Sequence, residues 1–170
     1  SHLRKFGGHD MAAGLRLTEP KLPEFVREFT SFANAGITAE MLSPVIEVDG
    51  DVELTDLRLE EVRRLESLAP FGRATPEPRL RLRRVRLAEN PRPLGQHGKH
   101  VSLLLQHTEV ANQPLLRLVA WNWAEKMMAA GDPLRRGTAI EAIIKPTIST
   151  WNGRVSVEAE LCDFAVISRD

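Results

Sequence analysis

The residues whose types and spacing best suit chemistry lie near the start of the chain, at Gly7, Gly8 and His9. Adjacent glycines can adopt positive φ and allow a ligand to approach the backbone closely. Backbone N–H groups and an imidazole can together hold the oxygens of a phosphate. The pattern therefore predicts a tight turn that places His9 beside a phosphate group. Because an isolated histidine is more often a packing or solvent residue, this interpretation depends on the sequence around it.

A second candidate site is basic. The chain is formally neutral, with 23 basic and 23 acidic residues, but residues 19–66 carry a net charge of −7 and residues 73–100 carry +6. This asymmetry favours a local site for a polyanion. A solvated strand face, or pairing of the arginines with the acidic residues before them, is the alternative. The candidate nucleic-acid-binding residues are Arg79, Arg81, Arg83, Arg84, Arg86, Arg92, Lys99, Trp151 and Arg154.

Trp151 is followed by an Asn-Gly pair, the residue pair most typical of a two-residue β-hairpin turn. An indole at such a turn, close to Arg154, suits the binding of a single strand. A stacked base contributes about 1–3 kcal/mol, and a cation follows the phosphates. The alternative is that the ring folds back and closes the end of a barrel. Of Trp121 and Trp123, we expect at most one to be a stacking platform.

The spacing of apolar residues predicts helices first and strands later. A helical period indicates helices over residues 22–33 and 59–68. Strict alternation then becomes typical of strands. A one-residue phase slip between Arg83 and Arg84 indicates a β-bulge in the first of them. Five strands are predicted at 79–87, 101–105, 115–120, 140–144 and 155–161, with a helix at 123–130.

Five strands with a helix between the third and the fourth is the element order of an OB-fold. The predicted fold class is therefore α+β, a short α/β segment followed by a five-stranded antiparallel OB-like β-barrel. Such a barrel binds single strands across strands 2 and 3 and the loops that join strands 1–2 and 4–5. Those loops are residues 90–99 and 147–153, and we expect them to place Lys99 and Trp151 on the same rim.

Several segments resemble a known family. Gly-Gly-His followed by x-x-Ala-x-Gly, over residues 7–14, resembles the signature of the DHH-associated domain, which closes the active site of DHH-family phosphoesterases. Residues 71–78 are similar to a segment of the RecJ family of bacterial single-strand-specific exonucleases, although Arg-Ala-Thr replaces the usual Pro-Gly-Asn type of turn. Residues 98–100 and 151–154 fit the same family. The chain is therefore identified as similar to the C-terminal part of RecJ.

The resemblance implies two domains. Residues 1–42 are expected to be the end of the DHH-associated domain, and residues 43–170 a RecJ-type OB-fold domain. Within the second, a lead-in strand and helix would occupy 43–72 and the barrel 78–168. The implied function is that of a fragment of an exonuclease that degrades single-stranded DNA from the 5′ to the 3′ end. The sequence opens at Ser1 without an initiator methionine, which also suggests a fragment.

The same resemblance gives His9, Gly7 and Gly8 the role of a clamp on the phosphate next to the scissile bond. The family binds two metal ions, manganese or magnesium, in a domain with an Asp-His-His motif that this sequence lacks. We therefore expect no cofactor, no metal site and no hydrolysis in this chain alone, which would instead guide single-stranded DNA. Further expected partners are replication or repair proteins such as single-strand-binding protein.

Two other classes of function stay open. One is a stand-alone, non-enzymatic OB module that binds single-stranded nucleic acid or docks a protein. The other is a DHH-type phosphoesterase acting on short oligoribonucleotides or cyclic dinucleotides, which shares Gly-Gly-His but lacks an appended barrel. A single cysteine, Cys162, excludes an intramolecular disulfide and suits a reducing compartment. With no membrane-spanning apolar run and no visible signal peptide, the expected location is the cytoplasm.

Overall fold

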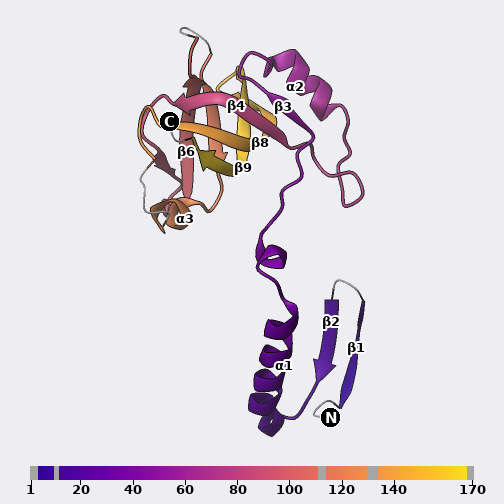
Figure 1. Ribbon diagram of the computed structural model, residues 1–170. Helices are drawn as coiled ribbons and strands as arrows, with labels where there is room; N and C mark the ends of the chain where they lie inside the picture. The colour runs from indigo at the N-terminus through magenta and orange to yellow at the C-terminus, as the bar shows by residue number, and fades with distance from the viewer. Residues whose placement is uncertain (1–3, 10–11, 111–113, 130–133, 168–170) are drawn as a thin grey trace. The chain divides into compact units, whose positions relative to one another are not determined.

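The computed structural model describes residues 4–9, 12–110, 114–129 and 134–167. The chain divides into two compact units, Ser1–Ile46 and Glu47–Asp170 (Figure 1). The domain boundary expected after residue 42 lies just before this division.

The first unit begins with an antiparallel hairpin of β1 (Lys5–His9) and β2 (Ala12–Arg16). The Gly-Gly-His segment lies within β1, so the prediction of a tight turn at these glycines is wrong. A Cβ at Gly8 would lie 2.6 Å from the carbonyl oxygen of Ala12 and 2.8 Å from Cα of Ala13. Glycine is therefore needed there for the close approach of two strands and not for a positive φ.

A 3-10 turn, η1 (Glu19–Lys21), leads into helix α1 (Leu22–Gly36), and a second 3-10 turn, η2 (Glu40–Leu42), follows. The helix forms where the apolar spacing predicted one. On its apolar side Phe25 stacks on Phe29, with ring centroids 5.6 Å apart. Every described residue of α1 is at least partly exposed.

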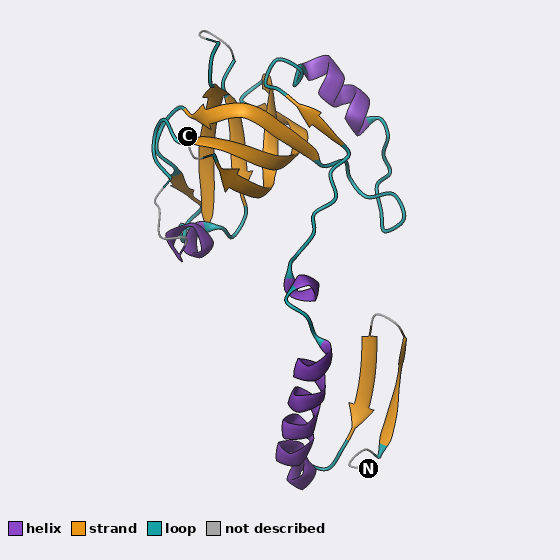
Figure 2. Cartoon of the chain, in the orientation of Figure 1, coloured by secondary structure: helices purple, strands orange, loops and turns teal. Residues whose placement is uncertain are grey.

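The second unit is a β-barrel (Figure 2). Its five main strands are β4 (Leu80–Leu87), β6 (His100–His107), β7 (Leu116–Ala120), β8 (Ala139–Trp151) and β9 (Arg154–Val166). They are neighbours in the order β4-β8-β9-β7-β6, and β6 also pairs with β4, which closes the ring. A helix, α3 (Ala124–Ala129), lies between the third and the fourth of these strands. The predicted OB-like barrel is confirmed.

The barrel is not wholly antiparallel, and in this detail the prediction is wrong. Strands β7 and β9 run parallel, with Arg117 opposite Glu158. A closed ring with an odd number of strands must contain a parallel pair, because direction cannot alternate all the way round. Two short strands are added within the described residues: β3 (Gly50–Val52) pairs parallel with β4, and β5 (Arg92–Leu94) pairs antiparallel with β6.

Alternate side chains of the strands fill the barrel. Burial alternates along the whole of β6, as expected for a strand with one face toward a core. Leu103 and Leu118 are among the fully buried side chains. His107, at the end of β6, is buried and polar, and its Nδ1 accepts hydrogen bonds from the backbone N–H groups of Glu109 and Val110. Nδ1 is thereby satisfied, and Nε2 lies 3.5 Å from a carboxylate oxygen of Glu53.

The predicted phase slip in β4 is a β-bulge in the structure. Pairing of β4 with β8 shifts between Leu82 and Val85, and Arg84 has a φ of 55°. The bulge lets Leu82 and Val85 both point into the barrel although they are an odd number of positions apart.

The hairpin between β8 and β9 is longer than predicted. Its turn consists of Asn152 and Gly153, with φ of 48° and 75°, as the Asn-Gly pair requires. Trp151 and Arg154 are already opposite each other in the ladder. The loop predicted over residues 147–153 is therefore mostly strand, because a two-residue turn leaves the backbone on both sides free to continue pairing.

The lead-in segment packs on the barrel. Within residues 43–72, where a lead-in strand and a helix were predicted, the strand is Gly50–Val52, and it pairs with β4. Helix α2 (Leu59–Glu66) follows, with Val62 fully buried. A carboxylate oxygen of Glu66 accepts a hydrogen bond from the backbone N–H of Ile148 at 3.0 Å, which ties α2 to β8.

Candidate nucleic-acid interface

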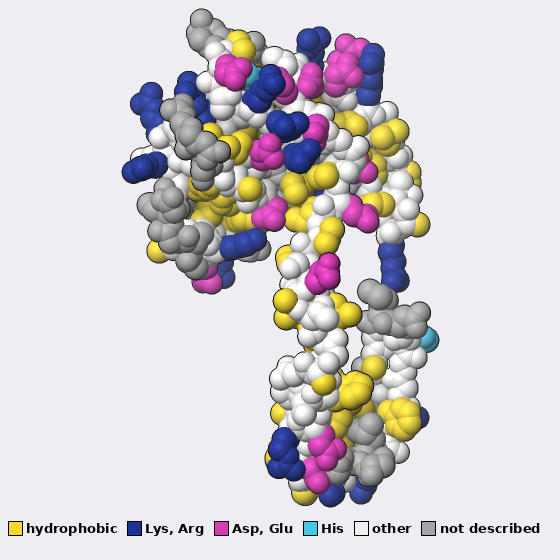
Figure 3. Space-filling view, viewed as in Figure 1, with side chains coloured by type: hydrophobic (Ala, Val, Ile, Leu, Met, Phe, Trp, Pro, Cys, Tyr) yellow, Lys and Arg dark blue, Asp and Glu magenta, His cyan; other side chains and the backbone are white. Residues whose placement is uncertain are grey.

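Three of the arginines predicted to bind nucleic acid lie against carboxylates of the same unit. Asp51 of β3 accepts hydrogen bonds from Nε and Nη2 of Arg81, at 2.7 and 2.8 Å, and from Nη1 of Arg83, at 3.3 Å. Arg84 lies 3.4 Å from Glu53. Figure 3 shows basic and acidic side chains interleaved over the barrel. Arg81, Arg83 and Arg84 therefore pair with acidic residues that precede them in the chain, which was the alternative to binding a polyanion.

The contact between Asp51 and Arg81 changes the titration of both groups. Hydrogen bonds from Arg81 hold the pKa of Asp51 below its ordinary value of 3.8 against the opposing effect of desolvation, and the charges of Arg81 and Arg83 lower it further. The hydrogen bonds to Asp51 raise the pKa of Arg81. A phosphate that approached these two arginines would therefore compete with a carboxylate already in place.

The remaining predicted cations differ in their surroundings. Arg92 pairs with Glu89, three residues earlier. Nε of Arg79 and Nε of Arg86 are buried. Lys99 and Arg154 are exposed, and among the described residues neither has a carboxylate within salt-bridge distance. These two cations are therefore free to meet an external anion.

The strand register places Lys99 and Trp151 at opposite ends of the barrel, so the expectation of one shared rim is wrong. Ala120, at the end of β7, pairs with Val101, two residues after Lys99. Strand β9 runs parallel to β7, and the β8–β9 turn precedes Glu158, which lies beside Arg117 near the start of β7. The β8–β9 turn therefore lies near the first residue of β7, and Lys99 lies near the last residue of β7.

Trp151 does not close the barrel. Its side chain is 76% exposed, and it lies opposite Arg154 at the tip of the β8–β9 hairpin. We call the outward side of β6 and β7, around Ser102, Leu104, Arg117 and Val119, the β6–β7 face. The exposed indole and guanidinium lie beyond the start of β7, at one end of this face. This is the arrangement that suits a stacked base and its phosphate.

A second exposed indole, that of Trp121, lies at the Lys99 end of the face. Trp121 was not among the predicted nucleic-acid-binding residues. Trp121 is 51% exposed and meets the imidazole of His100 edge-on, with ring centroids 4.9 Å apart. Trp123 instead packs against Phe164 and the core. The sequence did contain a signal for Trp121, because it continues the outward phase of Arg117 and Val119 while the residues between them are buried.

Between the two ends, the centre of the face is nearly neutral. Nε of Arg117 donates a hydrogen bond to the Ser102 hydroxyl at 3.2 Å, and its Nη1 lies 3.4 Å from a carboxylate oxygen of Glu158. Ser102, Leu104 and Val119 are partly exposed around it. The free cations and the exposed indoles are therefore concentrated at the ends of the face.

His9 is exposed at the end of β1 in the first unit. Asp10 and Met11, the next residues of the predicted motif, lie outside the described residues. No group of three or more His, Cys, Asp or Glu side chains able to hold a metal ion occurs in the parts of the chain that the structure describes. Likewise, no described helix is long and apolar enough to span a membrane.

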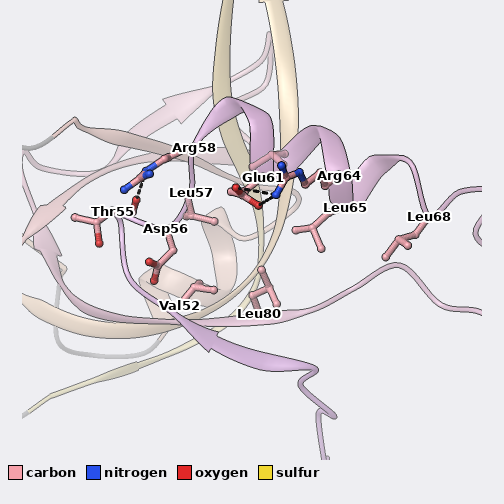
Figure 4. A pocket seen from close by; sticks show the side chains of 11 residues that line it. Val52, Thr55, Asp56, Leu57, Arg58, Glu61, Arg64, Leu65, Leu68 and Leu80 are labelled. Carbon is pink, nitrogen blue, oxygen red and sulfur yellow. Dashed lines mark hydrogen bonds and ion pairs between the residues drawn. The ribbon is translucent and has the colours of Figure 1, made fainter.

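An apolar groove of about 660 Å³ lies between β3 and α2 (Figure 4). Leu57, Leu65 and Leu80 point into it. The charged groups at its edge are engaged within the unit: Arg58 donates to the carbonyl oxygen of Thr55, and Arg64 pairs with carboxylates of α2. None of the predicted site residues lines this groove.

Comparison with known proteins assigns the chain to a family. The RecJ OB domain matches residues 48–163, which is more than half of the sequence. The chain belongs to the RecJ OB domain family. Over 164 residues it is 28% identical to the single-stranded-DNA-specific exonuclease RecJ of Bacillus subtilis, covering 96% of this chain and 20% of that protein. Over 154 residues it is 30% identical to RecJ of Dickeya dadantii, covering 91% and 25%.

The fold agrees with this family membership. The crystal structure of RecJ in complex with Mn²⁺ from Thermus thermophilus superposes with a TM-score of 0.67 over 99% of this chain and 22% of that one, at 24% sequence identity. At that identity the likeness shows a shared fold. The chain spans about a fifth to a quarter of the length of these RecJ proteins.

Proposed function

We propose that this chain is the part of a RecJ-like exonuclease that binds single-stranded DNA and guides it toward a two-metal phosphodiesterase centre carried by other residues. The observation that carries the proposal is the composition of the two ends of the β6–β7 face. Each end has an exposed indole and a cation without an internal carboxylate partner among the described residues: Trp121 with Lys99, and Trp151 with Arg154. A single strand would lie along the face between them.

Stacking and charge are the two terms that such binding needs. An indole can stack on any base, which makes binding tolerant of sequence, and a cation neutralises the phosphate beside that base. Lys99 and Arg154 can do so without first breaking an ion pair. Arg81, Arg83 and Arg84 have a mainly structural role in this scheme, because Asp51 and Glu53 already occupy them.

In hydrolysis, this chain would contribute one contact to the phosphate of the substrate. His9, with the backbone of Gly7 and Gly8, would hold the phosphate next to the scissile bond. Residues outside this chain would hold manganese or magnesium ions, whose chemistry would be the activation of a water. The direction of degradation would be 5′ to 3′. In a longer protein that includes the metal centre, we expect His9→Ala to lower nuclease turnover sharply while the barrel stays folded, as measured by digestion and circular dichroism.

The direct test is the binding of fluorescently labelled oligo-dT, measured by anisotropy across a salt series. Each phosphate that the protein neutralises adds about −0.7 to the slope of log K against log salt concentration. We expect Lys99→Ala and Arg154→Ala each to reduce this slope by about that amount. Trp151→Leu should weaken binding by about tenfold with little change in slope, because it removes stacking and leaves charge in place.

Arg63→Ala is the matched control, since Arg63 is an exposed cation on α2 and belongs neither to β6 and β7 nor to the β8–β9 turn. It should change neither the affinity nor the slope. If the chain fails to bind oligo-dT even at low salt, or if Arg63→Ala matters as much as Arg154→Ala, the barrel does not bind DNA in the way proposed.

A further inference from the structure

A small hollow of about 170 Å³ adjoins Trp121 on the outer surface of β7, β9 and β8. Its volume is several times the ~30 Å³ that one water occupies in the liquid. Val119 of β7, Glu160 of β9 and Thr147 of β8 contribute to its lining, and the indole of Trp121 forms one wall. The hollow lies at the Lys99 end of the face.

The indole wall is held in place before any ligand binds. His100 meets it edge-on, and Nδ1 of His100 accepts a hydrogen bond from the backbone N–H of Asn122 at 2.9 Å. Gly95, with a φ of 81°, also lies close to the imidazole, because a Cβ there would be 3.3 Å from Cδ2 of His100. A platform fixed in this way loses little conformational entropy when a base stacks on it.

Three carboxylates and one ammonium also line the hollow, and the charge of Glu160 acts on Lys145, its partner across the ladder. Lys145 donates a hydrogen bond to Glu77 at 3.1 Å, which raises the pKa of Lys145, and Glu158 is held by Arg117. Glu160 lies across the ladder from both Val119 and Lys145. Within the described part of the chain, the carboxylate of Glu160 makes no hydrogen bond or salt bridge.

A carboxylate accepts hydrogen bonds but cannot donate them, so it discriminates between bases. At the position of the amino group it can accept a hydrogen bond from cytosine or adenine, whereas thymine presents a carbonyl oxygen there and its one ring donor, N3–H, lies at a different position. The same carboxylates disfavour a phosphate in the hollow. The sugar–phosphate backbone would then pass on the side of Lys99, whose ammonium is exposed next to His100.

We propose that this hollow binds one base of a single strand, stacked on Trp121, and that Glu160 selects a base with an exocyclic amino group over thymine. The proposal rests on the proposed function, in that the barrel must bind single strands. It adds a preference for base type to binding that would otherwise be tolerant of sequence.

The test compares oligo-dC with oligo-dT of equal length by anisotropy at neutral pH and the same salt concentration. We expect the chain to bind oligo-dC about tenfold more tightly, the effect of one hydrogen bond to a charged acceptor. Glu160→Gln should bring the ratio of the two affinities close to one, because an amide can donate to thymine as well as accept from cytosine.

Variants of the indoles separate this hollow from the rest of the face. Trp121→Phe should keep the preference for oligo-dC, since a phenyl ring still stacks, and Trp121→Leu should lose it. Trp151→Leu is the matched control: it should weaken binding of both oligonucleotides equally and leave their ratio unchanged. Circular dichroism would confirm that each variant is folded.

Three other outcomes of these binding measurements would each contradict a different part of the proposal. Equal binding of oligo-dC and oligo-dT by the unaltered chain overturns the selective hollow and leaves the proposed function intact. A preference that survives both Glu160→Gln and Trp121→Leu overturns the assignment to this hollow. If neither oligonucleotide binds, the proposed function fails and this proposal fails with it.

Discussion

Arg81 and Asp51 are register partners in the parallel pairing of β4 with β3, and their side chains form two hydrogen bonds across it. Asp51 comes from the acidic part of the chain and Arg81 from the basic part. Much of the charge asymmetry along the sequence is thus cancelled in space, where β3 lies beside β4. The cations left for an external polyanion are fewer than the sequence suggests.

This pair predicts a specific loss of stability in acid. Because the pKa of Asp51 is lowered in the folded state, its contribution is complete above the unfolded value near 3.8 and is lost as pH falls through the folded pKa. Asp51→Asn should therefore be less stable than the parent protein near neutral pH, and the two should converge in strong acid. Urea unfolding at several pH values measures this. Glu60→Gln, which breaks a pair within α2 instead, should not reproduce the convergence if Asp51 is responsible.

The same substitution should affect DNA binding in the opposite sense. Asp51→Asn releases Arg81 and Arg83 and raises the local charge by one, so we expect binding of oligo-dT to tighten by about two- to threefold at low salt and less at high salt. Anisotropy measures this, again with Glu60→Gln as the control for net charge. Tightening by both variants would show a general effect of charge and none of the released arginines.

The barrel core predicts large effects of truncation. Leu118 is fully buried on β7 between the neighbouring strands. Leu118→Ala should lower the free energy of unfolding by about 2–5 kcal/mol, the cost of lost burial and of the cavity that remains. Leu115, in the same segment, is 51% exposed. Leu115→Ala should cost less than about 1 kcal/mol in the same urea titration, and equal losses would show that the core assignment is wrong.

In the β8–β9 turn, we expect a substitution to destabilise the protein through backbone strain although no side-chain contact is lost. Gly153 has a φ of 75°, and no atom lies near the position of an added Cβ. Gly153→Ala should therefore destabilise the protein by about 1–2 kcal/mol through backbone strain alone. Gly72 is equally unobstructed but does not have a positive φ. Thermal unfolding of Gly72→Ala should show almost no change, and a similar loss in both variants would contradict the strain argument.

Local patterns were sufficient for several elements. The phase slip at Arg83 predicted the bulge in β4, and the Asn-Gly pair predicted the turn after Trp151. These features depend on residues that are neighbours in the chain, so the sequence contains them directly. The role of Gly8 was misread because it depends on a contact between two strands. Its constraint comes from Ala12 and Ala13 on the facing strand and not from its own φ.

The element order, the alternation that fills the barrel and the family to which the chain belongs could be predicted from the residues alone, because each depends on local spacing or on motifs. Which charges and rings remain available depends instead on how distant strands pair. The β3–β4 pairing neutralised Arg81, the parallel β7–β9 pair put Trp151 and Lys99 at opposite ends, and the end of β7 exposed Trp121 beside His100. These relationships join residues far apart in sequence, and pairing of distant strands leaves no local trace in composition or period.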